Sequence, residues 1–492
     1  MCRAPSLLKT RAWRWGLRLL LQVVFLAGVL AAPARADIIV LKNGRRITAT
    51  TVTEENGRVS YETRAGRLTL PGSIVERIER GGPTFIDSAA DQVAQLPLTL
   101  PPAEALVGYD EVARAAVHDA SIDRNYIAKL EENARGGAAA AVTRVAAAHQ
   151  AAAQFELGRG DTDHALAHYR RALTFSPAQP ILLLNTAYLH LRRSEYSASL
   201  DYLERARRVA PDSADVAKLA GWAYYGLNKL DQAVEEWKRA QRLRPDPDVA
   251  RALEKAKRDQ QAESSFREGE SSHFVLRYNG SAAPGLARDV LRTLEDHFRA
   301  IESELNFTPA EPIGVILYTE QVFADITRAP AWVGALNDGR IRVPVQGLTA
   351  VPPELSRVLK HELTHSFIQQ KTRGRCPVWL QEGVAQWMEG QRSSETADLL
   401  VSAYERKAAM PLAAMEHSWM RMPGEVALYA YAWSLGVVEY LVATYGMRDL
   451  ERLLDRVAIE PSTEAATRSG LRMDYTELEQ QTAKYLRRTY LR

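Results

Sequence analysis

The stretch His361-Glu362-Leu363-Thr364-His365 places two histidines four residues apart, with a glutamate directly after the first. If this segment is helical, the two imidazoles lie on one face and converge on a single point. Zinc accepts neutral imidazole nitrogens as ligands, and a glutamate beside them can act as general base for a water molecule. The flanking apolar residues recur at helical spacing, which predicts a buried helix around this site: Leu355, Val358, Leu359, Leu363 and Phe367.

A third ligand is expected in the segment Trp379-Leu380-Gln381-Glu382-Gly383-Val384-Ala385. Glu382 follows His365 by 17 residues, and a glycine and a proline between them indicate a turn. This spacing places Glu382 on the next, antiparallel helix. The predicted site then has three protein ligands, His361, His365 and Glu382, and keeps a fourth position open. The alternative is that Glu382 is a carboxylate near a helix N-terminus that interacts with the helix dipole.

These motifs resemble those of the gluzincins, and more narrowly those of the peptidase MA-like domains of bacterial envelope proteins. The W-L-x-E-G-x-A segment is similar to the third-ligand motif of the M1 aminopeptidases. The resemblance implies hydrolysis of peptide bonds at a Zn²⁺ ion, with Glu362 as general base. It also implies that a tyrosine or histidine from a later helix stabilises the oxyanion. Tyr431 heads a Y-A-x-S pattern like that of the MA-like domains, so we choose it over Tyr429 for this role.

Two functional classes fit these residues. One is an exported zinc metallopeptidase, and the other is a catalytically silent envelope scaffold that uses a protease-like domain to bind protein. Every residue that the chemistry needs is present, which favours the enzyme. The chain lacks the G-x-M-E-N segment with which M1 enzymes hold a substrate amino terminus, so an endopeptidase is favoured over an aminopeptidase. Glu389 is expected either to orient a ligand histidine or to be a solvated surface acid.

The first 36 residues have the composition of a secretion signal. Five basic residues lie within residues 1–18, an apolar run extends from Leu19 to Ala32, and Ala34-Arg35-Ala36 matches an A-x-A cleavage site. The apolar run is shorter than the roughly 20 residues of a membrane-spanning helix, and no second apolar stretch is expected to span a membrane. We therefore predict cleavage after Ala36 and export to the periplasm or cell envelope. The alternative is an uncleaved signal anchor, which alone would hold the protein at a membrane.

Removal of that segment changes the charge balance. The chain holds 63 basic and 60 acidic residues, and six of the basic residues lie in 1–36, which contains no acid. The mature chain therefore has 57 basic and 60 acidic residues, and its negative balance argues against a nucleic-acid partner. Cys376 is the one cysteine after the cleavage site, so no intrachain disulfide can form. We expect a small buried residue there, with a metal-binding thiol as the alternative.

Residues 37–80 are predicted to form a small all-β module. Asn43-Gly44 and Asn56-Gly57 are hairpin dipeptides, and Ala65-Gly66 marks a third turn. About five short strands fit into this length, which favours a small barrel or a curled sheet. The clearest strand segments are residues 38–41, 46–52, 59–61 and 68–70. Residues 81–109 are rich in proline and glycine at both ends and are predicted to be a linker.

Residues 110–262 are predicted to form helical repeats. Prolines and alanines recur with a period of 34 residues, at Pro177, Pro211 and Pro245 and at Ala172, Ala206 and Ala240. This resembles the tetratricopeptide repeat, with core repeats at 146–179, 180–213 and 214–247. Residues 248–262 are expected to form a polar capping helix. The concave face of such a stack suits a protein or peptide partner, either substrate or adaptor, and the alternative role is that of a spacer.

Residues 263–492 are predicted to form the metallopeptidase domain. Strands are expected at 274–278, 313–318 and 340–345, with a helix at 284–305. Pro344 indicates that the last of these is an edge strand, because proline lacks a ladder donor. The predicted fold class is therefore multidomain: a small all-β module, an α-helical TPR solenoid, and an α+β gluzincin-like metallopeptidase domain.

Overall fold

The computed structural model describes residues 35–83, without 42–45, 50, 56 and 64–65, and residues 109–491, without 119, 280–283, 320–321, 324–334, 346–347, 418, 420–421 and 423. The chain divides into two compact units, one of residues 1–63 and 67–85 and one of residues 64–66 and 86–492. The predicted signal segment lies outside the described residues up to Ala34. The boundary predicted at residue 263 falls inside the second unit, so the repeats and the domain that follows them are described together.

The β module contains two three-stranded sheets. Their strand orders are β2-β1-β6 and β3-β4-β5. The segment 46–52, predicted as one strand, is divided between the sheets, because β2 ends at Ala49 and β3 begins at Thr51. Strand β6 was missed because its many charged residues obscure any apolar alternation. The strands are β1 (Arg35–Leu41), β2 (Arg46–Ala49), β3 (Thr51–Glu55), β4 (Arg58–Thr63), β5 (Gly66–Pro71) and β6 (Val75–Pro83).

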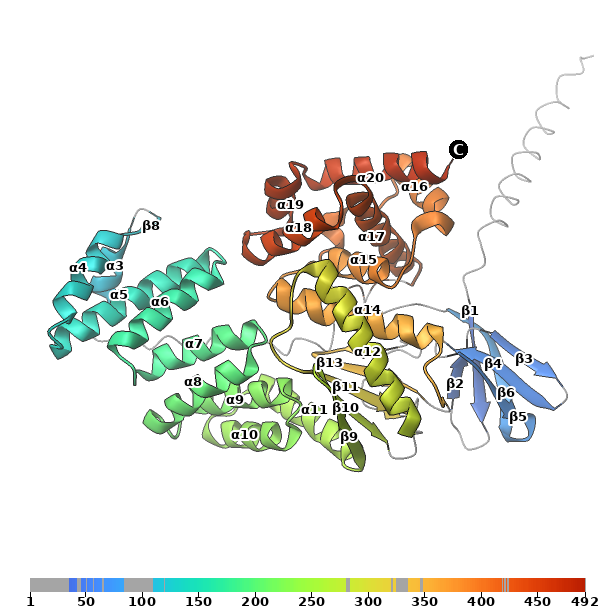
Figure 1. The fold of residues 1–492 in the computed structure, drawn as a ribbon, viewed down its shortest axis with the longest axis horizontal. Coiled ribbons are helices and arrows are strands. Elements are labelled where there is room, and N and C mark those ends of the chain that lie inside the picture. The colour runs from blue at the N-terminus through green and yellow to red at the C-terminus, as the bar shows by residue number, and fades with distance from the viewer. Residues whose placement is uncertain are drawn as a thin grey trace, which may run out of the picture. The chain divides into compact units, whose positions relative to one another are not determined.

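The second unit begins with helical hairpins that stack on one another (Figure 1). Small residues at the repeating alanine position are buried, and Tyr169, Leu203 and Trp237, again 34 residues apart, fill the space between the helices of each pair. The helices are α3 (Tyr109–Ala116), α4 (Arg124–Ala134), α5 (Ala139–Gly158), α6 (Thr162–Phe175), α7 (Pro180–Arg192), α8 (Tyr196–Val209), α9 (Ala214–Gly226), α10 (Leu230–Leu243) and α11 (Pro247–Glu263). Two short strands, β7 (Val117–His118) and β8 (Ser121–Ile122), form a turn between α3 and α4.

The same 34-residue period appears in the turns within each hairpin. Gly160, Ser194 and Asn228 each have a positive φ, of 82°, 58° and 59°. Each lies between the two helices of its repeat, where a left-handed residue ends the first helix and lets the second fold back. The structure therefore shows three TPR-like repeats, followed by α11 as a closing helix.

A five-stranded mixed sheet follows α11, with the order β12-β13-β11-β10-β9. Strands β10 (Phe274–Asn279), β11 (Ile313–Tyr318) and β13 (Arg340–Pro344) are parallel to one another, whereas β9 (Phe266–Glu270) and β12 (Leu336–Asn337) are antiparallel to their neighbours. The prediction that residues 340–345 form the edge strand was wrong, because β12 folds back at Gly339 and pairs with Ile341 and Arg342. Pro344 lies beyond this short pairing and is not required to donate to β12.

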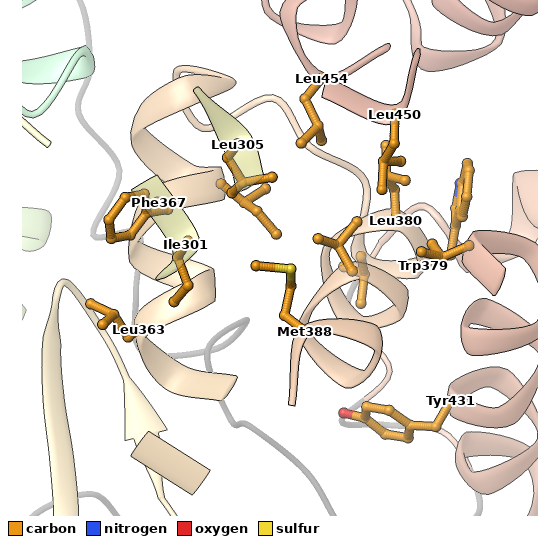
Figure 2. Close-up of a cluster of buried hydrophobic side chains, with 14 of the residues drawn as sticks. Ile301, Leu305, Leu363, Phe367, Trp379, Leu380, Met388, Tyr431, Leu450 and Leu454 are labelled. Carbon is orange, nitrogen blue, oxygen red and sulfur yellow. The ribbon is translucent and has the colours of Figure 1, made fainter. Parts of the chain in front are cut away.

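Helices cover one face of this sheet and extend the domain into a bundle. The buried side chains of α12 (Pro284–Leu305) and α14 (Pro353–Lys371) belong to one core with those of α15 (Val378–Met388) and α18 (Met447–Ile459). Figure 2 shows this core, with Ile301, Leu305, Leu363 and Phe367 on one side and Trp379, Leu380, Leu450 and Leu454 on the other. The remaining helices are α16 (Ala397–Glu405), α17 (Gly424–Tyr445), α19 (Thr463–Leu471) and α20 (Tyr475–Tyr490).

Helix α17 corrects one expectation from the sequence. Within the described residues, Val426–Tyr445 is long and apolar enough to cross a membrane, with a mean hydropathy of 1.4, although no second such stretch was predicted. Most of it is buried in the domain, where it packs against α15, α18 and α20. Its apolar composition is therefore explained by its place in the core.

Candidate metal centre

Helix α14 places the two histidines of the opening motif on one face. Its prolines lie at Pro352 and Pro353, at the start of the helix, where a missing N–H costs no hydrogen bond. The predicted apolar stripe is confirmed, because Leu355, Leu359, Leu363 and Phe367 are buried and Val358 packs against the same core. His361, Glu362 and His365 are also buried, with 6%, 3% and 1% exposure. Buried titratable side chains are costly unless they are paired, so these three need hydrogen-bond, ion-pair or metal partners.

Glu382 of α15 meets both histidines. His361 Nε2 lies 3.4 Å from Glu382 Oε2, and His365 Nε2 lies 3.6 Å from Glu382 Oε1. Each of the three residues offers one possible ligand atom, and these three atoms all lie within 4.8 Å of one another. All three side chains are buried, and they form the one group of this kind among the described residues. Two imidazole nitrogens and one carboxylate fit the donor set of a catalytic zinc site, which has three protein ligands and a fourth position for water.

Glu389 lies on the far side of His361. Its Oε1 is 3.5 Å from His361 Nδ1, and its side chain is 8% exposed. Of the two expectations for this residue, the structure therefore favours the orienting carboxylate over the solvated acid. A carboxylate at Nδ1 leaves Nε2 directed at Glu382 and fixes the tautomer that a metal requires.

The electrostatics of the site favour a positive charge. Burial opposes protonation of His361, but the carboxylates of Glu389 and Glu382 outweigh it and raise its pKa well above the usual value. Burial lowers the pKa of His365 to about 4, so this imidazole stays neutral. A histidine that binds a metal must be deprotonated, so a divalent cation at this site would compete with a proton for His361.

The position of α15 depends on its close approach to α17. A Cβ at Gly383 would lie 2.4 Å from the carbonyl oxygen of Ser434, so only glycine fits there without separating the helices. One turn later, Gln386 Nε2 donates to the carbonyl oxygens of Glu382, at 3.1 Å, and Tyr431, at 3.0 Å. Gly383, directly after Glu382, and the buried amide of Gln386 therefore fix the position of Glu382 beside α14.

The general-base candidate Glu362 is held through its backbone as well. Asn337 of β12 donates from Nδ2 to the carbonyl oxygen of Glu362, at 2.8 Å, and to Ser366 Oγ, at 2.7 Å. Asn337 is buried, and its Oδ1 accepts from the backbone N–H of Gly339. The edge of the sheet thus contacts the helix at the turn that carries Glu362.

Tyr431 and Cys376 lie outside the metal triad. Tyr431 is 8% exposed, belongs to the apolar core, and packs edge-to-face on Trp419 with ring centroids 4.8 Å apart. Figure 2 shows its ring extending away from α17. Its role as an oxyanion donor stays a prediction. Tyr429 stacks on Trp433, and Cys376 packs against the core and is not part of the His361, His365 and Glu382 group.

Sequence reasoning missed Asn337, Ser366 and Gln386. The available signal was Asn337-Asp338-Gly339, since an Asp-Gly pair before a strand is a hairpin signature. It would have placed β12 beside β13, although not against α14.

Comparison with known families agrees with this geometry. Residues 300–488, which contain all four residues of the proposed zinc site and its base, match the family model of the Peptidase MA superfamily. This part of the chain is a Peptidase MA-like domain. The chain is also similar to the first TPR domain of the human RPAP3 protein, at 20% identity over 24% of this chain and 92% of that one, with a TM-score of 0.23. The first TPR of Spaghetti (RPAP3) bound to the HSP90 peptide SRMEEVD matches at 20% identity over 24% and 93%, also with a TM-score of 0.23. No curated protein matches the chain.

Proposed function

We propose that this protein is a zinc-dependent metallopeptidase that acts as an endopeptidase. The observation that carries the proposal is the buried convergence of His361, His365 and Glu382 in a Peptidase MA-like domain, with Glu362 next to the first histidine. When bound, zinc would activate a water molecule and polarise the scissile carbonyl. The two histidines and Glu382 would hold the ion, and Glu389 would orient His361.

In this proposal the protein residues handle the proton. Glu362 accepts a proton from the attacking water and returns it to the leaving amine. Tyr431 is retained as the proposed donor to the oxyanion. Metal analysis of the purified chain, together with cleavage of a peptide library, tests the proposal. One zinc per chain with cleavage supports it, whereas a chain that binds zinc and cleaves nothing supports the silent scaffold.

The second part of the proposal is export. The sequence before Ala36 is the support for it, and Ile38–Leu41 supply most of the pairing of β1 with β6. Cleavage after Ala36 would therefore leave that pairing in place. We expect N-terminal sequencing of the protein from the cell envelope to begin at Asp37. An intact N-terminus in the membrane fraction would instead establish the signal anchor.

The third part is recruitment of a protein substrate or adaptor by the repeats. The partner was predicted to bind the concave face of the stack. Because α7 is buried from Ile181 to Leu191 and α9 has no exposed residue, the exposed side chains of these two repeats lie mainly on α8 and α10, and we propose that surface instead. We expect charge reversal at the exposed Glu204, Arg208 and Arg242 to raise KM for a native protein substrate while kcat stays constant. Cleavage of a short generic peptide by the same variants is the control. If KM for the native substrate does not move, the repeats do not recruit it through this surface.

A further inference from the structure

A stripe of charged residues on α11 is buried where the repeats meet the sheet. Lys255, Asp259 and Glu263 are spaced by four residues and therefore lie on one face of the helix. Their exposed fractions are 9%, 0% and 5%. A capping helix was expected to be solvated on its polar side, so this burial requires compensating charges.

The compensating charges come from the hairpin of β12 and β13. Asp338, Arg340 and Arg342 alternate along the chain and share one face of the sheet, with exposed fractions of 5%, 1% and 0%. The two stripes match in charge. Lys255 Nζ lies 2.6 Å from Asp338 Oδ2, Arg342 Nη2 lies 2.8 Å from Asp259 Oδ2, and Arg340 Nη2 lies 2.6 Å from Glu263 Oε2.

Two tyrosines extend this network into both neighbouring elements. Tyr225 of α9 donates to Asp259 Oδ2 at 2.9 Å and accepts from Arg342 Nη2 at 3.0 Å. Tyr318 of β11 donates to Glu263 Oε1 at 2.6 Å and accepts from Arg342 Nη1 at 2.7 Å. The network thus joins the third repeat, the closing helix and the central strands. A shift of α11 along the hairpin would leave buried charges without partners. The network therefore fixes the register of α11 on the hairpin.

The other face of the same hairpin holds the helix of the metal site. Successive strand residues point to opposite faces, so Asp338 meets Lys255 while the preceding residue, Asn337, meets α14. The two hydrogen bonds from Asn337 end at the Glu362 carbonyl and at Ser366 Oγ. One short hairpin is therefore fixed by the repeats from one side and fixes the catalytic helix on the other.

The earlier repeats also contact the Peptidase MA-like domain. Arg373, just after α14, donates to Thr162 Oγ1 at 3.0 Å and forms an ion pair with Asp163 at the first repeat. In the second repeat, the backbone N–H of Ser197 donates to Glu311 Oε1 at 2.8 Å. The attachment therefore extends along the array and is not confined to the α11 connection.

We propose that the repeat array is a positioning part of the catalytic unit. In this proposal the stripe on α11 holds the β12–β13 hairpin, and Asn337 transmits that position to the backbone of α14 at Glu362. Lys255 and Asn337 are positioning residues, since neither is a metal ligand. The effect on catalysis rests on the proposed function, whereas the effect on α14 does not. A substitution in the charged stripe of α11 is thus expected to change the position of Glu362 and to lower turnover even when the substrate is too short to reach the repeats.

The test compares Lys255→Met with Lys218→Met. Lys218 of α9 forms a similar ion pair within the array, with Nζ 2.7 Å from Asp246 Oδ2, and is 7% exposed. In the zinc-free protein, hydrogen exchange at the α14 amides near residues 362–366 is expected to accelerate about tenfold in Lys255→Met and to stay unchanged in Lys218→Met. With zinc and a short generic peptide, Lys255→Met is expected to lower kcat by roughly tenfold or more at nearly constant KM and zinc content.

Asn337→Asp is the second variant, because it keeps the shape of the side chain but removes the donor. It should accelerate exchange in α14 while exchange in α5 to α10 stays at the wild-type rate, and it decides the question if Lys255→Met does not fold. Unchanged α14 exchange in both variants, or an equal acceleration in Lys218→Met, would overturn the proposal. If the wild-type protein cleaves no peptide, the proposed function fails, while the exchange comparison still decides whether the array positions α14.

Discussion

Glu362→Gln is expected to keep its zinc and its fold and to lose peptide turnover by roughly 10²- to 10⁴-fold. Glu362 follows His361 on α14, is 3% exposed, and is not one of the three residues that converge as metal ligands. The amide has nearly the same volume, so the packing of α14 is preserved, but it cannot accept a proton from water at neutral pH. The measurement is kcat on a library-selected peptide together with zinc content per chain.

Glu354→Gln is the matched control for this change. Glu354 lies in the first turn of the same helix, so the substitution removes the same charge from α14 at a distance from the metal ligands. Activity of this variant should stay within about twofold of wild type, as expected for a surface substitution. Full turnover in Glu362→Gln would rule out the general-base assignment. Loss of zinc along with turnover would show that Glu362 contributes to coordination.

The convergence of His361, His365 and Glu382 was predictable because its information is local. Helical spacing brings His361 and His365 together, and the short connection to α15 leaves few positions for Glu382. The same holds for the repeats, where a 34-residue period in sequence becomes a 34-residue period in turns and buried side chains. The three converging residues lie on two consecutive helices, and the repeating residues lie within single helical hairpins.

The support of the site was not predictable in this way. Asn337 contacts α14 across 25 residues of sequence, and nothing in its neighbourhood indicates which helix it will meet. The sequence predicted only a polar capping helix over residues 248–262 and did not indicate that the stripe of Lys255, Asp259 and Glu263 on α11 is buried. Burial of such a stripe is possible only when complementary charges face it, and those lie about 80 residues away in the β12–β13 hairpin. Single-segment periodicity cannot distinguish a solvated stripe from a neutralised one.

Substitutions around the proposed zinc site are expected to lower zinc affinity to different degrees. His361→Ala removes one of three ligand atoms, and the two that remain bind catalytic zinc poorly, so the purified variant should contain almost none. His365→Ala and Glu382→Ala should behave in the same way. Glu389→Gln should be intermediate, because Glu389 contacts His361 Nδ1 without being a ligand, and the loss of such a carboxylate typically weakens metal affinity by about 10- to 100-fold.

Zinc affinity by competition with a chelator measures the whole series, and thermal unfolding in excess chelator shows whether each variant is folded. The order of the zinc affinities distinguishes a ligand from a residue that only orients one. If Glu389→Gln binds zinc as weakly as His361→Ala, then Glu389 is itself a ligand. If His361→Ala retains full occupancy, the metal is bound elsewhere and the assignment of the centre to α14 and α15 is wrong. The geometry favours the graded outcome, because Glu382 reaches the Nε2 atoms of both histidines while Glu389 reaches only the Nδ1 atom of one.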